Sequence, residues 1–322
     1  MSRFPPCHRA DPFPALRRVA LAALCALAIC LPLATTWAEE VAVEGPSAQD
    51  WLERMNAALS QRPYRGTLVY VRDGRLDALR IVHQPAAGGI GERRLSTLSG
   101  EALEVVARAD GLRFLDGEGH AGWQGGSAAL PSAPRAVRPL PALYELHLAG
   151  ADRIADRSAQ VIEIRARDGF RYGHRLWLDR HSGLPLKSAS LGSDGRVVEQ
   201  LMFTEVQIDP PLPPSAALPV APAVAPNVPD APWQVLDAPE GFALALVDAG
   251  PSVHLLYSDG VAHVSVYVEA LSAQQPTVSG AFGRGALQGF GRIAHGRQVV
   301  VVGDVPAATV ERFAQGVTPA TR

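Results

Sequence analysis

The residue types that most often carry catalysis occur in this chain without the spacing that catalysis needs. Residues 250–254 (Gly-Pro-Ser-Val-His) begin like the nucleophile elbow of a hydrolase, but histidine stands where that turn needs glycine. The glycines of residues 283–289 miss the spacing of a dinucleotide-binding loop, and no Gly-Lys pair of a phosphate-binding loop exists. The histidines after His8 include no HExxH and no close pair with the helical spacing of metal ligands. The sequence therefore predicts a protein that is not an enzyme, with no catalytic residues, no metal and no cofactor.

The first 38 residues have the composition of an export signal. Arg17 and Arg18 precede a short apolar run at residues 19–33, and small residues follow at Thr36 and Ala38. This pattern predicts a signal peptide that is cleaved after Ala38. Because the run is too short to span a bilayer comfortably, a cleaved signal is favoured over an uncleaved anchor.

The remaining chain, residues 39–322, has no cysteine and a negative net charge. Cys7, Cys25 and Cys30 all lie in the predicted signal, which excludes disulfides and cysteine-based metal sites from the exported protein. The signal also holds four arginines and one aspartate, so 26 of the 30 basic and 31 of the 32 acidic residues remain, a net charge of −5. Nucleic-acid-binding proteins usually carry a basic surface, so no nucleic-acid partner is expected.

A proline-rich segment divides the exported chain into two units. Residues 210–229 carry eight prolines among small apolar residues, a composition that favours extended polyproline II over a helix or a central strand. We therefore expect a linker over residues 210–232, between a larger domain at 39–209 and a smaller domain at 233–322. Each domain is long enough to bury a core of its own.

The larger domain is expected to open with a helix and to continue mainly as strands. Ser47-Ala-Gln-Asp50 has the form of a capping box, an apolar face follows, and Pro63 ends the helix. Strands joined by short polar turns then predict an antiparallel sheet, because parallel pairing needs long crossovers. Residues 140–148 are compatible with a helix. In the smaller domain, a hairpin at Asp259-Gly260 and a last helix over 306–316 predict a second α+β fold.

Three segments of the chain have the most distinctive amino-acid sequences. Residues 168–188 read DGFRYGHRLWLDRHSGLPLKS, residues 64–74 read YRGTLVYVRDG, and residues 254–269 read HLLYSDGVAHVSVYVE. In the first of these, side chains alternate between two faces as in a half-buried strand, and after a turn that ends at Gly183 a second strand follows. In these segments the chain resembles the MucB/RseB family, the periplasmic regulators of the sigma-E envelope-stress response. Leu103 departs from the family, whose members often carry arginine there, so no role for that arginine is carried over.

The resemblance implies an α+β fold and a regulatory function. The first domain of the family resembles the antiparallel half-barrels of LolA and LolB, whose concave face holds acyl chains, and a small C-terminal α+β domain follows the Pro-rich linker. The implied location is the periplasm, and the implied partner is the periplasmic domain of an RseA/MucA-like membrane anti-sigma factor. The protein would shield this partner from regulated proteolysis until lipopolysaccharide, lipid acyl chains or a mislocalised lipoprotein weakened the complex. Formation of a homo-oligomer stays open.

Two sets of residues are the candidates for these contacts. Acyl chains are expected on the inward faces of the first-domain strands, at Leu68, Tyr70, Leu79, Ile81, Leu176 and Leu178. Apolar residues in such strands are more often plain core, which is the competing interpretation. The partner is expected at the groove between the domains and at the hairpin of Tyr257, Ser258, Asp259 and Gly260.

Two other functions remain as alternatives. A periplasmic lipid or lipoprotein carrier is suggested by the first domain alone, although simple carriers of that fold lack a second domain. An unrecognised hydrolase is the third interpretation, and the missing catalytic spacings argue against it.

Overall fold

The structure is a computed structural model of the chain. It describes residues 45–86, 89–100, 102–108, 111–116, 121–125, 138–139, 141–211, 231–250, 252–272 and 276–320. The predicted signal peptide lies outside the described residues, as does most of the predicted linker, residues 212–230. Below, residues 45–211 are called the N-terminal region and residues 231–320 the C-terminal region. Both belong to one compact unit, Glu44–Arg322.

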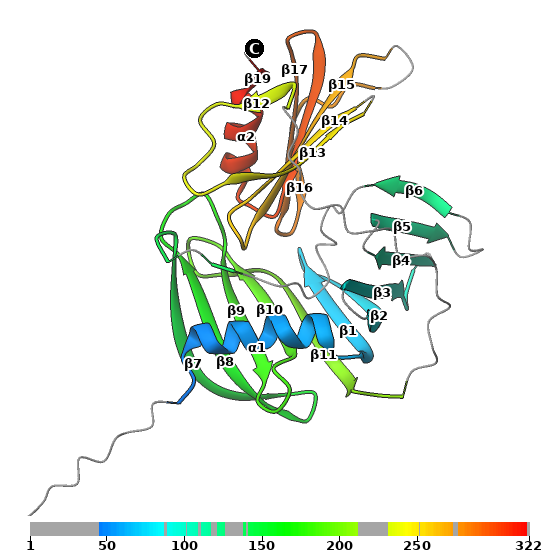
Figure 1. Cartoon of the computed structure of the whole chain (residues 1–322), viewed down its shortest axis with the longest axis vertical. Coiled ribbons are helices and arrows are strands. Elements are labelled where there is room, and N and C mark those ends of the chain that lie inside the picture. Colours follow the sequence, from blue (N-terminus) through cyan, green and yellow to red (C-terminus); the bar gives the residue numbers. More distant parts are fainter. Residues whose placement is uncertain are drawn as a thin grey trace, which may run out of the picture. The chain divides into compact units, whose positions relative to one another are not determined.

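The N-terminal region begins with helix α1, which spans Ala48–Gln61 (Figure 1). The Ser47 side chain accepts a hydrogen bond from the Asp50 amide (3.2 Å), and the Asp50 carboxylate accepts one from the Ser47 amide (2.8 Å). This reciprocal pair satisfies amides that have no partner within the helix, and it confirms the predicted capping box. The helix ends before Pro63, as predicted.

Eleven described strands follow and form one open antiparallel sheet. Their order is β6-β5-β4-β3-β2-β1-β11-β10-β9-β8-β7. Strands that are neighbours in sequence therefore pair, except that β6 and β7 form the two edges and β1 pairs with β11. The strands are β1 (Tyr64–Arg72), β2 (Arg75–Ala86), β3 (Gly89–Thr97), β4 (Leu103–Arg108), β5 (Gly111–Asp116), β6 (Ala121–Gly125), β7 (Tyr144–Ile154), β8 (Arg157–Ala166), β9 (Gly173–Asp179), β10 (Pro185–Leu191) and β11 (Val197–Ile208).

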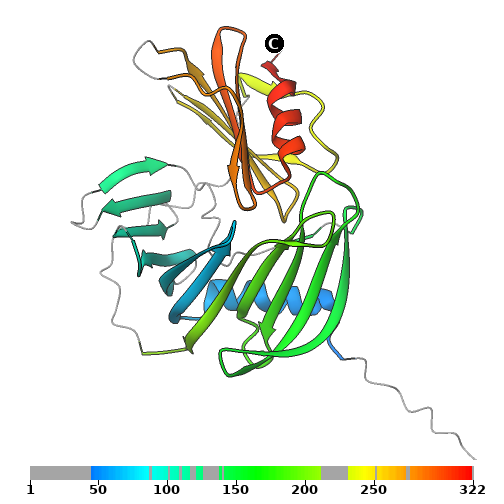
Figure 2. The same cartoon turned by 180° about the vertical axis from the view of Figure 1, so that it is seen from behind.

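The sheet curves around α1, so that the helix lies in front of the strands in Figure 1 and behind them in Figure 2. Below, the face that carries α1 is called the α1 face. Trp51, Leu52, Met55 and Leu59 of the helix are buried in one apolar cluster with strand residues from β1, β2, β3, β7, β8, β9 and β11. The result is an antiparallel half-barrel that is closed on its concave side by a helix.

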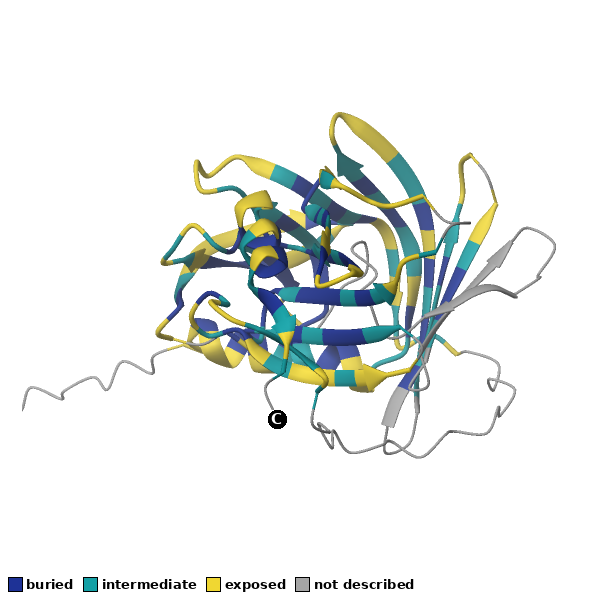
Figure 3. Cartoon of the chain, turned by 90° about the horizontal axis from the view of Figure 1, so that it is seen from above, coloured by how far each residue is buried: buried dark blue, intermediate teal, exposed yellow. Residues whose placement is uncertain are grey.

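Strands β8, β9 and β10 are buried on both faces. Behind them, away from α1, Val161, Trp177, Leu186 and Ala189 form a second, smaller apolar cluster. Buried residues therefore follow one another in β8 and β9, without the clean alternation of a sheet that has one solvated face. Figure 3 shows the buried, intermediate and exposed residues over the described part of the chain.

The C-terminal region forms a second antiparallel sheet of six described strands, in the order β13-β14-β15-β18-β17-β16. The strands are β13 (Ala243–Ala249), β14 (Val253–Ser258), β15 (His263–Ala270), β16 (Gly280–Arg284), β17 (Leu287–Ala294) and β18 (Arg297–Gly303). Helix α2 (Ala307–Gly316) packs on one face through Val310, Phe313 and Ala314. The short strands β12 (Trp233–Val235) and β19 (Val317–Pro319) pair with each other.

These elements confirm the predicted α+β class and correct one element of it. Residues 140–148, which are compatible with a helix in sequence, instead contain the start of β7. Tyr144 lies opposite Ala166 and Leu146 opposite Ile164 in the ladder with β8. This long-range pairing decides the conformation of a segment whose local pattern is ambiguous.

Candidate functional site

The six residues predicted to contact acyl chains lie together on the α1 face. Leu68, Tyr70, Leu79, Ile81, Leu176 and Leu178 belong to the cluster that contains α1, and none exposes more than 6% of its surface. A pocket beside Leu68 and Leu201 has a volume of about 10 Å³, room for about one water molecule. The helix and the neighbouring sheet side chains therefore cover these six residues. Acyl contact stays a prediction, and it requires these side chains to part.

The four residues predicted to contact a protein partner form the end of β14 and the turn that follows. Tyr257 is buried in the C-terminal core, where its ring meets Phe313 of α2 edge to face. The Ser258 hydroxyl accepts a hydrogen bond from the Gly260 amide (3.0 Å). Oδ1 of Asp259 accepts hydrogen bonds from the Val261 amide (2.9 Å) and from the Ala262 amide (2.7 Å). This is the predicted turn chemistry.

Gly260 brings this turn against the N-terminal region. Its carbonyl oxygen accepts a hydrogen bond from the Arg138 amide (2.7 Å). Its φ of +91° favours glycine, and a Cβ there would lie only 2.2 Å from the Arg138 carbonyl oxygen. In this structure the turn therefore contacts the chain's own N-terminal region, and its contact with a separate partner stays a prediction.

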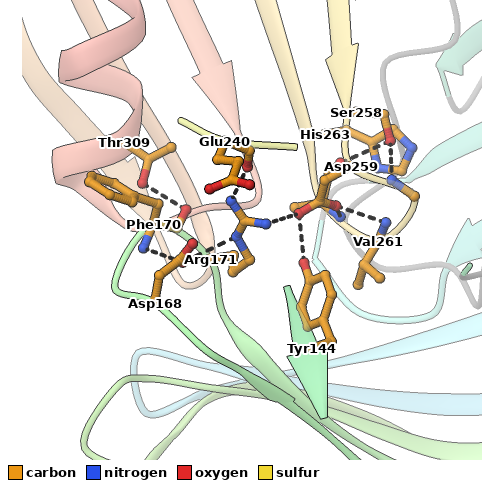
Figure 4. A network of polar contacts seen from close by, with 12 residues as sticks. Tyr144, Asp168, Phe170, Arg171, Glu240, Ser258, Asp259, Val261, His263 and Thr309 are labelled. Atoms are coloured by element: carbon orange, nitrogen blue, oxygen red, sulfur yellow. Dashed lines mark hydrogen bonds and ion pairs between the residues drawn. The ribbon is translucent and has the colours of Figure 1, made fainter. Parts of the chain in front are cut away.

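A buried arginine joins the N-terminal region to the same turn (Figure 4). The Arg171 side chain is fully buried, and its guanidinium lies 3.1 Å from the Asp168 carboxylate and 3.2 Å from the Asp259 carboxylate. Its Nη2 donates to the Glu240 carbonyl oxygen at 2.8 Å. The Tyr144 hydroxyl donates to Oδ2 of Asp259, also at 2.8 Å. The Arg171 guanidinium and the Asp259 carboxylate are thus held together without solvent, and the partly exposed Asp168 carboxylate lies beside them.

The two oxygens of Asp259 have different tasks. Oδ1 holds the amides of its own turn, whereas Oδ2 faces Tyr144 and Arg171 of the N-terminal region. Burial raises the pKa of the Tyr144 hydroxyl and the Asp259 carboxylate reinforces that rise, so the hydroxyl remains a donor. The conformation of the turn and the contact between the regions therefore depend on the same carboxylate.

Helix α2 adds a neighbouring contact. The buried Thr309 hydroxyl donates to the carbonyl oxygen of Phe170 at 2.8 Å, one residue before Arg171. The Arg312 guanidinium lies over the Phe170 ring, 5.0 Å from its centre. The segment that leads into β9 is thus held by both the turn after β14 and the last helix.

A second polar contact lies at the tip of the β16–β17 hairpin. The Gly285 amide donates to the Asp73 carboxylate (3.0 Å), and the Ala286 amide donates to Oε2 of Glu199 (3.1 Å). The same Glu199 oxygen accepts a hydrogen bond from the Tyr70 hydroxyl at 2.6 Å. Asp73 belongs to the β1–β2 turn and Glu199 to β11, so two distant segments of the first sheet hold one hairpin of the second.

Each of these two contacts, at the turn after β14 and at the β16–β17 hairpin, is linked to the core of the N-terminal region by its own tyrosine. The rings of Tyr70 and Tyr144 belong to the apolar cluster of the α1 face. Their hydroxyls reach Glu199 and Asp259, the two carboxylates that hold the C-terminal region. A change in the packing of the α1 face would therefore move both hydroxyls.

Most of these residues carry no signal of a functional site in the sequence. In the sequence, Arg171 is only one residue of the alternating segment 168–188, and Tyr144 lies in residues 140–148, which are compatible with a helix. The buried position of an arginine between two aspartates follows from tertiary structure, since Asp259 is 88 positions beyond Arg171 in the chain. Among the described residues, no group of three histidine, cysteine or carboxylate side chains could hold a metal ion, and no helix is long and apolar enough to cross a membrane.

Comparison with known proteins gives consistent matches over the two regions. Residues 47–221 match the model of the MucB/RseB N-terminal domain, and residues 227–318 match that of the MucB/RseB C-terminal domain. The sigma factor AlgU regulatory protein MucB of Pseudomonas aeruginosa is 33% identical over 307 residues, which cover 86% of this chain and 93% of that protein. The sigma-E factor regulatory protein RseB of Escherichia coli is 25% identical over 301 residues, 84% of this chain and 91% of that protein.

Solved structures agree with these matches. The crystal structure of MucB is 31% identical in sequence, with a TM-score of 0.64, and the match covers 85% of this chain and 98% of that one. The complex structure of Pseudomonas aeruginosa MucA and MucB matches with a TM-score of 0.62 at 31% identity, over 85% of this chain and 99% of that one.

Proposed function

This chain belongs to the MucB/RseB family, and we propose that it is a periplasmic negative regulator of a sigma-E envelope-stress pathway. In this role it binds the periplasmic region of a membrane anti-sigma factor and shields that region from regulated proteolysis. One observation carries the proposal: the similarity to the MucB chain of the MucA complex extends over 85% of this chain, at 31% identity, and so includes both regions. The proposal therefore includes a partner that is held by both regions.

A lipid signal would act through the α1 face. An acyl chain that enters this face has to part the side chains that now fill it, among them the rings of Tyr70 and Tyr144. Their hydroxyls hold the carboxylates of Glu199 and Asp259, which in turn hold the C-terminal region. A lipid that prefers the parted conformation lowers the affinity for any partner that prefers the closed one, by its differential binding to the two states.

The direct test is partner capture. Tagged residues 39–322 are incubated with the purified periplasmic segment of the cognate anti-sigma factor, with and without lipopolysaccharide. We expect a complex that lipopolysaccharide weakens and that slows cleavage of the segment by its protease. Absence of a complex in both conditions would reject the proposal.

A lipid or lipoprotein carrier is the second candidate, and the extended apolar cluster of the α1 face is the observation that favours it. The two functions are separated by a transfer assay, in which an acylated lipoprotein moves between donor and acceptor vesicles. A carrier accelerates this transfer without the anti-sigma segment, whereas a regulator binds lipid without accelerating transfer.

A further inference from the structure

Glu199, near the start of β11, differs from the other buried carboxylates of the described chain. Four described residues with carboxylate side chains are buried, and three of them form ion pairs with arginine. The pairs are Glu163 with Arg165 and Arg175, Asp179 with Arg157, and Asp259 with Arg171. For the Glu199 carboxylate, no described arginine, lysine or histidine nitrogen lies within 4.0 Å. Folded proteins usually pair a buried charge, because it has lost its hydration. Glu199 is therefore a carboxylate whose cation is missing from the described chain.

The hydrogen bonds of Glu199 use only one of its two oxygens. Oε2 accepts from the Tyr70 hydroxyl (2.6 Å) and from the Ala286 amide (3.1 Å). These neutral donors fix the position of the carboxylate but do not balance its charge. Asp73, in the β1–β2 turn, is similar: its Oδ2 accepts from the Gly285 amide (3.0 Å), and no described cation lies within 4.0 Å. Each carboxylate therefore has a second oxygen for a further donor.

A cavity of about 560 Å³ lies beside both carboxylates. It is lined by the end of β1, the β1–β2 turn and the start of β11, through Val71, Arg72, Asp73, Gly74, Val197, Val198, Glu199 and Gln200. Its volume is within the range of ligand sites, about 300–1,000 Å³. Arg72 is the one basic residue of this lining, and its guanidinium lies 3.8 Å from the Asp77 carboxylate and 4.9 Å from the centre of the Tyr70 ring. The two carboxylates of the lining therefore remain without a cation.

We propose that this cavity binds a basic side chain, arginine or lysine, of the protein partner. The positive charge pairs with Oε1 of Glu199 and with the Asp73 carboxylate. The hydrocarbon stem packs on Val71, Val197 and Val198, since long basic side chains cover apolar surface while their charged end reaches polar groups. This inference rests on the proposed function, in which the chain holds the periplasmic region of an anti-sigma factor. It adds the residue type that the partner supplies and the site that receives it.

Exposed apolar side chains beside the cavity favour a protein as the source of the cation. Val197 lines the cavity and is 52% exposed. Leu76, which lies opposite Val71 in the ladder of β1 and β2, is 61% exposed. A metal ion or a small amine leaves both side chains in water, whereas a protein segment covers them. Asp73 and Glu199 also hold the β16–β17 hairpin, so a segment bound at this cavity lies next to the C-terminal region.

Neutral variants that keep the shape of the carboxylates test the proposal. E199Q and D73N each retain an oxygen that can accept from the hairpin amides, but they lose the negative charge. Binding of residues 39–322 to the purified periplasmic segment of the cognate anti-sigma factor is measured by calorimetry. We expect E199Q to weaken binding about tenfold, and D73N to weaken it less, because Asp73 is exposed and its charge is screened by water.

E145Q is the matched control for the change in net charge. Glu145 lies on the edge strand β7, its side chain is 43% exposed, and it takes no part in the lining of the cavity. The variant removes one negative charge from the same sheet and should leave the affinity unchanged. If E199Q binds as tightly as the wild type, or if E145Q weakens binding as much as E199Q does, the proposal is wrong.

Substitutions in the partner separate a direct contact from a structural role of Glu199. Each arginine and lysine of the segment is replaced by glutamine in turn, and each variant is measured against the wild type and against E199Q. We expect one replacement to weaken binding to the wild type about tenfold but to leave binding to E199Q nearly unchanged, because that pair is already lost. If every replacement weakens binding to both proteins by the same factor, Glu199 acts only through the hairpin, and the proposal is wrong.

The affinity of the wild type tests the function on which the proposal rests. If the wild type binds the segment but no basic residue of the segment is coupled to Glu199, the cavity receives no basic side chain, while the partner-binding function stands. If the wild type binds no segment, the regulatory function itself is wrong, and the inference is rejected with it.

Discussion

Arg171 lies at the contact between the two regions. Its fully buried guanidinium faces the carboxylates of Asp168 and Asp259, and the Asp259 side chain is also fully buried. Removing one partner of a buried ion pair leaves an uncompensated charge and costs about 3–5 kcal/mol. We therefore expect R171M, which keeps much of the side-chain volume, to lower the free energy of unfolding by about this amount in urea denaturation.

An exposed ion pair provides the control for this substitution. Arg153 pairs with Asp156, and the two side chains are 74% and 79% exposed. Such pairs contribute about 0–1 kcal/mol, so R153A should be nearly neutral. If R171M costs no more than R153A, the buried network does not stabilise the protein.

The burial of His83 should make the free energy of unfolding depend on pH. Burial lowers its pKa in the folded protein from 6.5 to about 4. Below pH 6.5 the unfolded chain therefore takes up a proton that the folded protein does not, so the stability contribution is complete above pH 6.5 and is lost as the pH falls toward 4. The loss amounts to up to about 3 kcal/mol.

We expect the difference in unfolding free energy between the wild type and H83Q to change by this amount between pH 7 and pH 4. Parallel pH profiles for the two proteins would contradict the prediction, and the exposed H181Q should follow the wild type.

At the scale of elements, the capping box of α1 should stabilise the helix that covers the six acyl candidates. Ser47 and Asp50 exchange two hydrogen bonds at the start of the helix. Replacing such a cap by alanine costs about 1 kcal/mol. S47A should therefore lower the thermal unfolding midpoint of the protein. Ser60, whose hydroxyl donates to the Asn56 carbonyl oxygen near the exposed end of the same helix, provides S60A as the control with little expected change. Equal effects of S47A and S60A would show that the cap contributes nothing.

Elements that form through interactions between residues close in sequence could be predicted, whereas elements that form through interactions between distant residues could not. The ends of α1 and α2 follow from local signals, the capping box, Pro63 and Pro306, and the structure confirms them. Strand alternation predicts that the six acyl candidates point inward, and their common cluster with α1 confirms this direction, while acyl contact stays a prediction. Residues 140–148 are compatible with a helix in sequence but contain the start of strand β7, because their conformation is set by pairing with β8.

The polar contacts between the regions could not be predicted in the same way. Tyr144 and Asp259 are 115 positions apart, and Glu199 and Ala286 are 87 apart. No sequence period relates residues at such distances, and only the closed fold brings them together. The turn chemistry of Asp259 was visible from its neighbour Gly260, but its second oxygen had no visible partner in the sequence.

At the scale of the whole molecule, the β16–β17 hairpin tip tests whether the second contact holds the two regions together. Gly285 has a φ of +60°, and a Cβ there would lie 2.9 Å from Oε2 of Glu199 and 3.2 Å from Cβ of Arg72. G285A therefore combines a strained backbone with a collision at the contact, and should displace the Ala286 amide from Glu199. We expect hydrogen exchange at the Ala286 amide to become about tenfold faster, a change of about 1.4 kcal/mol.

Gly296 separates the collision from the backbone strain. It has a φ of +70° in the turn between β17 and β18, and a Cβ there would meet no atom within 4 Å. G296A thus introduces similar strain into the same sheet without touching the N-terminal region, and should leave exchange at the Ala286 amide unchanged. If both variants accelerate exchange equally, the hairpin tip responds only to the stability of its own sheet. If only G285A does so, and it also weakens capture of the anti-sigma segment, then partner binding depends on the contact that Tyr70 and Glu199 connect to the core of the α1 face.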